Sequence, residues 1–550
     1  MNALVVSPIA IPLLTAFLCM MAWRSVRLQR ALSIAGALAL FACSVLLFAR
    51  VLDVGVLAAD IGGWRAPFGI TMVADTLSSL MVLLNGVVAV AVVVYSIGAI
   101  GPRREKHAYH TLVHCLLASV SGSFLSGDIF NIYVWFEVML MSSFVLLTLG
   151  GERGQLEGAL KYVTLNLLSS SLFLSAVGLL YGLVGSLNLA DIAIKLGSAG
   201  DGTRPVIAAI AVLFMASFGI KAAIFPFFFW LPASYHTPAP VVSALFGGIL
   251  TKVGVYAMMR VYTLIFAPVF PAAGEILLWI AAFTMVTGVL GAAAQYEIRR
   301  ILSFHIVSQI GYMIMGLAIA LLVLERMADA PTEDRPAMLA TAAMALGGVA
   351  FFILHNILAK TNLFFVAGVV HRLRGTGELK ELGGLYKERP YLSLMFMVSA
   401  MALAGIPILT GFWGKLILVV AGVRAGEYWI VGVSLGVGVL TLFSMTKIWA
   451  EAFWKARPEE AEGAEPKPDD TRGTGWMNAV VAGFVVLIIG VSVFAGPIYR
   501  VTERAGHELI ERAPYIRAVL DEEYLRSLPG GIGERWIEPR AETASAGEGR

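Results

Sequence analysis

The chain has 550 residues, of which 58% are hydrophobic and only 14% are charged, with 40 Lys and Arg against 37 Asp and Glu. A soluble fold does not need such a composition, which indicates a polytopic membrane protein. The near-balanced charge and the scatter of basic residues over short loops exclude nucleic acid as a partner. The three cysteines, Cys19, Cys43 and Cys115, lack CxxC spacing, so neither a disulfide framework nor a metal site is expected.

The first apolar run, Met1 to Trp23, could be mistaken for a signal peptide. It has no Lys or Arg before it and no small-residue cleavage site after it, so we expect an uncleaved first span. Arg24, Arg27 and Arg30 follow at once, which places that loop in the cytoplasm and the N-terminus outside. Further basic residues, at 103–106, 153, 299–300 and 372–389, fall on the same side of the predicted alternation, and both termini are therefore predicted to be extracytoplasmic.

The apolar segments predict an all-α polytopic membrane protein with about 14 transmembrane helices, because a helix needs about 20 apolar residues to cross the hydrocarbon core. The predicted spans cover residues 1–23, 28–51, 71–100, 109–126, 129–149, 157–185, 205–233, 240–266, 271–294, 301–324, 337–371, 390–423, 429–454 and 475–498. Residues 455–474 form a polar linker that we expect to be cytoplasmic and flexible. In the extracytoplasmic tail, 499–550, short amphipathic stretches are expected on the membrane surface and disorder beyond Trp536.

Two spans pair a proline break with a lysine. Lys221 lies near the middle of its span, and Pro226 follows little more than one turn later; since proline cannot donate to the Ala222 carbonyl, the helix should break beside the ammonium. Pro407 and Lys415 repeat the pattern. An interruption is also expected at the polar residues 355–362, because the span 337–371 is too long for one straight crossing.

Corresponding broken segments in two halves of a chain suggest inverted repeats. Three N-terminal helices (1–108) would precede a first repeat of helices 4–8 (109–266) and a second of helices 9–13 (271–454), with helices 7 and 12 broken.

Ionisable residues deep in apolar spans are costly and point to function. Glu137 has no basic residue three or four positions away, so its partner must come from another helix, and the central Lys221 is the natural candidate. If the carboxylate approaches and recedes, Lys221 can load and release a proton. Lys252, Lys360 and Lys415 would extend the pair into a lateral row of titratable groups.

Several other polar residues leave two interpretations open. His355 either packs helices together or relays protons, while His305 and His236 are either points of proton access or solvated histidines at helix ends. Four residues near span ends, Lys161, Arg260, Lys447 and Asp75, are expected to snorkel to the interface. No cofactor is expected: the segment from Gly411 to Lys415 lacks the Ser or Thr of a phosphate loop, so energy must come from an ion gradient or a partner protein.

These motifs resemble a known family. The segments Phe130-Asn-Ile-Tyr-Val-Trp-Phe-Glu137, Lys221 with Phe225-Pro226, Lys252-Val-Gly254, and Gly405-Ile-Pro407 with Gly411-Phe-Trp-Gly-Lys415 are similar to the antiporter-like subunits of respiratory complex I, membrane-bound hydrogenases and Mrp-type multisubunit cation/proton antiporters. The sequences of residues 185–192 and 355–364 are most similar to those of the D subunits of the Mrp group. The resemblance implies a fourteen-helix fold with two inverted five-helix repeats.

The resemblance also implies roles. Glu137 and Lys221 would be the transport pair and Lys252, Lys360 and Lys415 the relay of a Na+/H+ antiporter subunit, which is a secondary transporter rather than an enzyme. It would work in a hetero-oligomer with other antiporter subunits in a bacterial plasma membrane, exchanging protons for Na+ or another monovalent cation. One alternative is a proton-pumping subunit of complex I (NADH:quinone oxidoreductase) or a membrane-bound hydrogenase. Another is a structural scaffold whose buried charges only fix helix packing.

Overall fold

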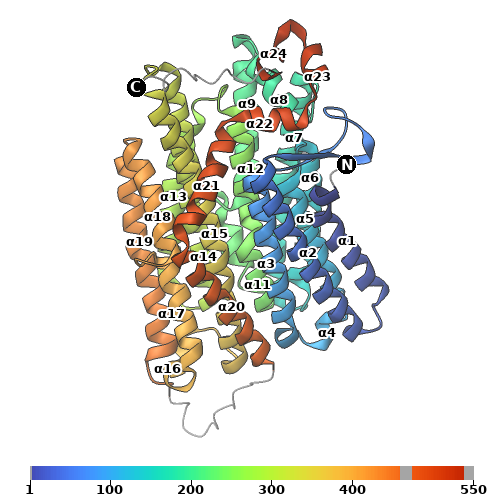
Figure 1. Cartoon of the computed structure of the whole chain (residues 1–550). Coiled ribbons are helices and arrows are strands. Elements are labelled where there is room, and N and C mark those ends of the chain that lie inside the picture. Colours follow the sequence, from blue (N-terminus) through green and yellow to red (C-terminus); the bar gives the residue numbers. More distant parts are fainter. Residues whose placement is uncertain (1–2, 459–472, 538–550) are drawn as a thin grey trace, which may run out of the picture.

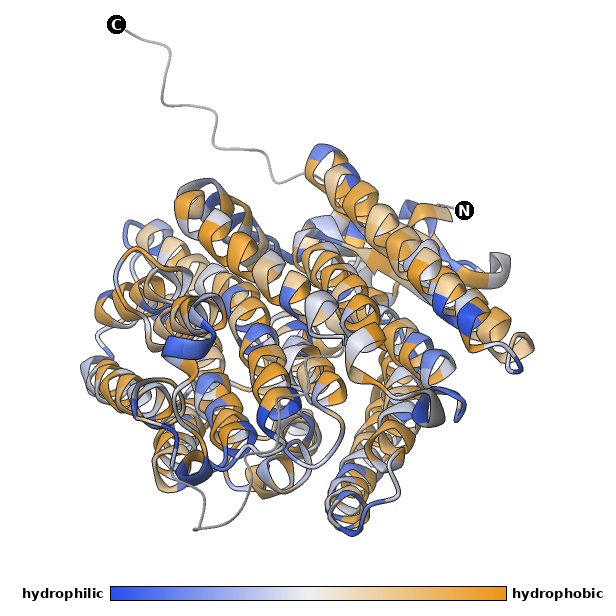
Figure 2. Cartoon of the chain, turned by 90° about the horizontal axis from the view of Figure 1, so that it is seen from below, coloured by the Kyte–Doolittle hydropathy of each residue, from blue (hydrophilic) through white to orange (hydrophobic). Residues whose placement is uncertain are grey.

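A computed structural model describes residues 3–458 and 473–537, which form a bundle of helices that stand side by side (Figure 1). Hydrophobic residues run along most of each helix, and hydrophilic residues gather at helix ends and in loops (Figure 2). Within the described residues, 12 helical segments are long and apolar enough to cross a membrane. The all-α polytopic fold is therefore confirmed. Most of the linker predicted at 455–474 and of the disordered end predicted beyond Trp536 lies outside the described residues, at 459–472 and 538–550.

The first part of the chain folds as α1 (Ala3–Met21), α2 (Val26–Val54), the hairpin β1 (Leu57–Asp60) and β2 (Thr71–Ala74), α3 (Thr76–Ala99), α4 (Pro102–Glu105), α5 (Tyr109–Leu125), α6 (Ile129–Thr148), α7 (Arg153–Val184), α8 (Leu189–Gly197), α9 (Arg204–Ala222), α10 (Trp230–Ser234), α11 (Pro240–Leu245) and α12 (Thr251–Val261). The second part folds as α13 (Ala273–Ala294), α14 (Ile298–Asp329), α15 (Arg335–Arg374), α16 (Leu385–Glu388), α17 (Pro390–Ala404), α18 (Thr410–Arg424), α19 (Tyr428–Ile448), α20 (Thr474–Val493), α21 (Ala495–Ile510), α22 (Arg512–Val519), α23 (Glu522–Ser527) and α24 (Glu534–Ile537).

Two predicted spans are absent from the set of 12, each for a structural reason. Helix α5 has only 17 residues, and the predicted span 390–423 is divided into α17 and α18, each of 15 residues. If these two segments are counted as crossings, the described residues contain the 14 predicted spans, but the count of 14 crossings stays a prediction.

Short side chains before several helices explain where those helices begin. Ser25, Asp75 and Asp128 precede α2, α3 and α6, and each accepts a hydrogen bond from a backbone N–H in the first turn. These bonds satisfy donors that have no partner inside a helix. Glu297 does the same for α14, by accepting from the Arg300 N–H at 2.6 Å.

Helices α9 and α17 end where the sequence predicts a break. Ala223, at φ 60°, ends α9 two residues after Lys221, and Gly405, at φ 88°, ends α17 two residues before Pro407. The expected interruption in the span 337–371 is wrong, because α15 continues without a break through all 40 of its residues. Its polar residues are buried against other helices, so they need no distortion of the backbone to find an environment.

The loops fall on two faces of the bundle. The loops that carry the basic residues meet on one face, the basic-loop face: Arg30 bonds Glu105, Arg104 bonds Glu152, and Arg299 donates to the Pro238 carbonyl at 2.8 Å. The β1–β2 hairpin, α8 and α22 to α24 lie on the opposite face, together with the start of α1 (Figure 1). This grouping agrees with the predicted alternation of the loops.

The tail after α20 packs on protein, although its amphipathic pattern predicts a location on the membrane surface. Helix α21 crosses α15, where a Cβ on Gly347 would lie 2.8 Å from the Glu503 Cα. Glu508 accepts from the Thr76 N–H at 2.9 Å and thereby caps α3. Tyr524 donates to Asp191 of α8 at 2.9 Å. The apolar face of the tail is therefore buried against the bundle.

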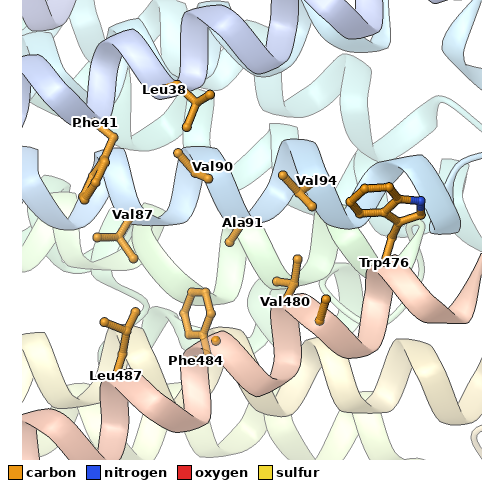
Figure 3. A pocket seen from close by; sticks show the side chains of 12 residues that line it. Leu38, Phe41, Val87, Val90, Ala91, Val94, Trp476, Val480, Phe484 and Leu487 are labelled. Carbon is orange, nitrogen blue, oxygen red and sulfur yellow. The ribbon is translucent and has the colours of Figure 1, made fainter.

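An apolar surface groove of about 480 Å³ lies between α2, α3 and α20 (Figure 3). Its walls include Leu38, Phe41, Val87, Val90, Val480 and Phe484. Since its labelled side chains are hydrocarbon apart from the indole nitrogen of Trp476, the groove offers no site for an ion.

Candidate functional site

Glu137 lies in the middle of α6 and is half-buried. Its carboxylate accepts a short hydrogen bond from the Ser170 hydroxyl of α7. The sequence does not single out Ser170, because it is one of three consecutive serines (169–171) and serine in a helix usually bonds its own backbone. Two other helices therefore provide partners for Glu137: α7 provides a hydrogen bond and α9 provides a positive charge.

That charge is Lys221, which is only 4% exposed and points its ammonium over the Phe136 ring at 5.6 Å. Within the described residues the Lys221 Nζ makes no hydrogen bond and no ion pair within 4 Å. Glu137 acts on it electrostatically from farther away, as expected for a pair that does not touch. Lys221 is therefore a buried cation held beside a carboxylate but not bonded to it.

The break next to Lys221 is supported by three helices. The Trp230 indole of α10 donates to the Ile220 carbonyl at 3.0 Å, and the Phe225 N–H donates to the Thr284 hydroxyl of α13 at 2.9 Å. A Cβ on Gly254 of α12 would lie 2.7 Å from the Ala222 nitrogen, so glycine lets α12 touch the break. The prediction of a broken helix at Pro226 is confirmed, and its free backbone groups are used by α10 and α13.

Lys252 is fully buried in α12, and its Nζ donates to the Gly247 carbonyl at 2.7 Å. Gly247 belongs to a π-helical turn, Phe246–Leu250, which the sequence does not reveal. Such turns often occur at functional sites. Glycine near Lys252 lets α15 approach closely, because a Cβ on Gly247 would lie 2.6 Å from the Phe364 ring.

Lys360 of α15 is fully buried and donates to the Leu302 carbonyl of α14 at 3.0 Å. Lys252 lies near enough to repel it electrostatically. His305, one turn after Leu302, faces the charges of Lys360, Lys415 and Lys447. The alternative of a solvated position for His305 is wrong, because this side chain is 0% exposed, and its role in proton entry or relay stays a prediction. Helices α13 and α15 cover α14, which the sequence of α14 alone does not reveal.

His355 and Lys415 connect α15 to the second break. The His355 Nδ1 pairs with the Thr410 hydroxyl at 2.7 Å, at the first residue of α18. The Lys415 ammonium donates to the Ala404 carbonyl at 2.9 Å, across the break at Pro407, and lies 5.1 Å from the centre of the Tyr312 ring. The second break is therefore closed by side chains from α15 and α18.

His236 lies away from this row, in the loop between α10 and α11 on the basic-loop face. Its Nδ1 pairs with the Pro232 carbonyl at 2.8 Å. Burial lowers the pKa of His236 to about 4, although the hydrogen bond to Pro232 opposes this shift. The imidazole is therefore neutral at physiological pH.

The four residues expected to snorkel behave differently from one another. Lys161 does reach solvent and bonds Glu157 on the surface. For Asp75 and Arg260 the expectation is wrong, because they form a buried ion pair, with only 3% and 4% of their side chains exposed. Each lies near a span end, but a position in the sequence does not show that a partner of opposite charge lies opposite. Lys447 donates to the Ala293 and Gln295 carbonyls, each at 2.7 Å, and is half-buried.

The structure brings most predicted site residues into two groups that interact electrostatically: Glu137 with Lys221, and a second group of Lys252, Lys360, His305, His355 and Lys415. Their continuation as one lateral row stays a prediction. His236 stands apart from both groups. The residues that sequence reasoning missed are neutral partners, Ser170 and Thr410, whose roles depend on contacts between helices.

Comparison with known proteins agrees with this geometry. The family model described as NADH:quinone oxidoreductase/Mrp antiporter, TM, matches residues 126–325 and 336–441. The D subunit of the Na(+)/H(+) antiporter of Alkalihalophilus pseudofirmus is 39% identical to the chain, covering 95% of it and 100% of the relative. The protein of the same name from Bacillus subtilis is 37% identical over the same shares.

Solved structures give the same assignment. A chain of the Mrp complex from Dietzia sp. superposes with a TM-score of 0.82 at 28% identity, covering 94% of this chain and 100% of that one. A chain of respiratory complex I from Thermus thermophilus shares the fold, with a TM-score of 0.73 at 22% identity over 92% of this chain and 99% of that one. The chain belongs to the NADH:quinone oxidoreductase/Mrp antiporter family of membrane subunits, and within it to the group of antiporter D subunits.

Proposed function

We propose that this chain is the proton-translocating D subunit of a multisubunit Na+/H+ antiporter, and that protons move along the row from Glu137 to Lys415. The observation that carries the proposal is Lys221, a buried ammonium at a helix break and beside a carboxylate, which makes no hydrogen bond to any part of the chain that the structure describes. A desolvated charge without a partner is costly, and membrane proteins retain such groups mainly for function.

The first step uses Glu137 as the group that changes the proton affinity of Lys221. At about 7 Å and an effective dielectric of about 20, a carboxylate stabilises an ammonium by roughly 2 kcal/mol. When Glu137 is close and ionised, Lys221 holds its proton; when the carboxylate turns away or is protonated, Lys221 releases it. The Ser170 hydroxyl would hold the carboxylate in one of these two positions.

The later steps use lysines that rest on backbone carbonyls. Lys252, Lys360 and Lys415 each donate to one carbonyl, of Gly247, Leu302 and Ala404. Repulsion between Lys252 and Lys360 disfavours the state in which both are charged, so a proton arriving on one promotes release from the other. His355 and His305 lie among these lysines and would pass protons between them.

The proposed function also includes an assembly and an orientation in the membrane. The chain would work in a hetero-oligomer with the other antiporter subunits, in a bacterial plasma membrane, with the basic-loop face in the cytoplasm and both termini outside. It would exchange protons for Na+ or another monovalent cation as a secondary transporter and not as an enzyme. The proton-pumping alternative, in complex I or a hydrogenase, is less favoured because the relatives at 39% and 37% identity are named as antiporter subunits.

The test uses everted membrane vesicles that contain the whole complex. Glu137→Ala and Lys221→Ala should each abolish the Na+-dependent collapse of a pH gradient, while the other subunits still copurify with the chain. Glu157→Ala and Lys161→Ala are matched controls, since this ion pair lies on the surface of the next helix, and they should exchange at the normal rate. Full exchange by either row variant contradicts the proposal, and copurified quinone- or ferredoxin-linked oxidation would favour the redox alternative.

A further inference from the structure

A second set of buried polar side chains lies apart from the lysine row, between α2, α3 and α5. It begins at the basic-loop face, where Arg30 donates to both oxygens of Glu105, at 2.8 and 2.7 Å. The Arg30 side chain is 31% exposed, whereas that of Glu105 is 0% exposed. The His110 Nε2 of α5 lies 3.5 Å from the same carboxylate. The cluster therefore connects the surface of the basic-loop face to the buried side of α5.

The set continues along one face of α5. His110, His114 and Ser121 are separated by four and seven residues, which places them on one stripe of a helix. The His114 Nε2 pairs with the Ser33 hydroxyl of α2 at 2.9 Å. The Asn85 amide of α3 donates to the Ser121 hydroxyl at 2.9 Å. All of these side chains are buried, so α2 and α3 enclose the stripe.

Several atoms along this stripe keep unused hydrogen-bonding capacity. Within the described residues the His110 Nδ1, the His114 Nδ1 and the Asn85 Oδ1 make no hydrogen bond. A buried polar atom without a partner is costly, and such atoms usually contact a ligand that can form hydrogen bonds. His110 and His114 are one helical turn apart, roughly 5–6 Å, which is a gap that one water molecule bridges. His114 and Ser121 are two turns, or roughly 10 Å, apart, so the path needs more than one water molecule there.

The far end of the stripe, near the C-terminal end of α5, approaches Lys252 through α12. The Tyr256 hydroxyl of α12 donates to the Phe124 carbonyl of α5 at 2.6 Å, one turn beyond Ser121. Tyr256 follows Lys252 by four residues, so the two side chains lie on the same face of α12. The stripe therefore ends one turn from a buried lysine of the proposed relay.

We propose that His110, His114, Asn85, Ser121 and Tyr256 line a hydrated path, the α5 path, that carries protons from the basic-loop face to Lys252. This inference rests on the proposed function, because it gives the lysine row its connection to the solvent. An imidazole accepts a proton on one nitrogen and releases one from the other, and the hydroxyl and amide groups orient the water molecules between the rings. The path ends at the charges of Arg30 and Glu105, the charged groups that face His110.

The ligand chemistry favours protons over metal cations. A site for Na+ needs several oxygen ligands around one point, whereas this stripe offers isolated oxygens separated by imidazoles. Two carboxylates lie near it, and both are already paired: Glu105 is bonded by Arg30, and Asp75, near Tyr256, is bonded by Arg260. The α5 path also fills a gap left by His305, which is buried among the lysines and does not reach the surface.

The functional arm of the test measures Na+-driven proton transport by the intact complex in proteoliposomes. His114→Gln can still bond Ser33 but cannot bind a proton, and it should slow transport by about tenfold or more. Ser121→Ala should slow it by about threefold, because one orienting hydroxyl is lost. The matched control is Ser119→Ala, whose hydroxyl bonds only the Leu116 carbonyl of its own helix, and it should leave the rate unchanged. Wild-type rates for both path variants would overturn the inference.

The second arm does not depend on antiport. In a complex in which Cys19, Cys43 and Cys115 are replaced by alanine, Ser121→Cys should react with a small water-borne thiol reagent, and Ser119→Cys should not. Equal protection of both cysteines would overturn a hydrated path. If Glu137→Gln alone stops transport while His114→Gln and Ser121→Ala do not, the lysine row stands and only the α5 path fails. If Glu137→Gln transports normally, the proposed function itself fails.

Discussion

The two broken helices hold their lysines in different ways. In the first half, Lys221 lies just before the break, and within the described residues its ammonium makes no hydrogen bond. In the second half, Lys415 lies just after the break and donates back across it to the Ala404 carbonyl at 2.9 Å. A carboxylate, Glu137, acts on the first lysine, whereas the second has the imidazole of His355 and the Tyr312 ring beside it.

The two lysines therefore have different roles, although both occur in the same sequence pattern of a lysine near a proline break. Lys221 contributes nothing to holding its break, because Trp230 and Thr284 bond the free backbone groups there. Lys415 does hold its break, together with His355. The first site is therefore built for a change of protonation controlled by Glu137, and the second combines a titratable group with a structural one.

The largest expected effect is the loss of proton exchange when either of the two lysines is removed. Lys221→Met and Lys415→Met should each reduce Na+-dependent proton exchange by at least about 100-fold, because both remove a group that must bind the transported proton. Exchange is measured in everted vesicles as the collapse of a pH gradient. If Lys415→Met exchanged normally, the proton would leave the row before the second break, and the two halves would differ in function as well as in structure.

The next effect concerns the contact that shapes the first break. Gly254→Ala should destabilise the complex by about 1–3 kcal/mol and slow exchange, because its Cβ would overlap the Ala222 backbone. Gly436→Ala in α19 is the matched control, since its Cβ would meet nothing within 4 Å, and helix propensity alone would make it neutral or slightly stabilising. Thermal unfolding of the purified complex measures the stability of both variants. Equal unfolding midpoints for the two variants would contradict close packing of Gly254 against the break.

A smaller effect separates the two lysines by stability. Lys415→Met should cost about 1–2 kcal/mol, because the hydrogen bond to the Ala404 carbonyl is lost. Lys221→Met should be neutral or stabilising, because it removes a buried charge without a hydrogen bond. Thermal unfolding of the two variants in the same detergent makes the comparison. A greater loss in Lys221→Met would assign the structural role to the first lysine instead.

The smallest effect is a pH dependence outside the membrane. The pKa of His236 is about 4 in the folded protein, lowered by burial, against about 6.5 when unfolded. Its contribution to stability is complete above about pH 6.5 and is lost as the pH falls toward 4, since the unfolded chain then binds the extra proton. Between pH 7.5 and 5, His236→Gln should lose about 1 kcal/mol less stability than the wild type, allowing for partial exposure. An equal loss of stability in both proteins would show that the pKa of His236 is the same in the folded and the unfolded chain, which contradicts a lowered pKa in the fold.

Much of this site is predictable from residue types alone. A lysine or carboxylate far from the ends of an apolar span has few explanations, so Glu137, Lys221 and Lys252 are recognisable at once. The two breaks are predictable as well, because proline removes a donor wherever it occurs. These inferences depend on the chain's local sequence and not on how the helices pack.

The rest of the site depends on which helices pack against one another, and the sequence does not show this. The π-helical turn before Lys252 arises where α12 packs against α15. Asp75 and Arg260 are separated by 185 positions, and Thr76 and Glu508 by 432, so neither contact has a local signal. An amphipathic tail helix buries its apolar face equally well in lipid or in protein, and only the structure distinguishes the two for α21.

The central claim is that Lys221 carries a proton and does not merely supply a positive charge. Lys221→Arg tests this claim most directly, because arginine keeps the charge but does not release a proton at any physiological pH. The measurement is Na+-dependent collapse of a pH gradient in everted vesicles that contain equal amounts of assembled complex. We predict that Lys221→Arg is as inactive as Lys221→Ala. Exchange at the wild-type rate would contradict the account and leave Lys221 as a fixed charge that orders the helices around it.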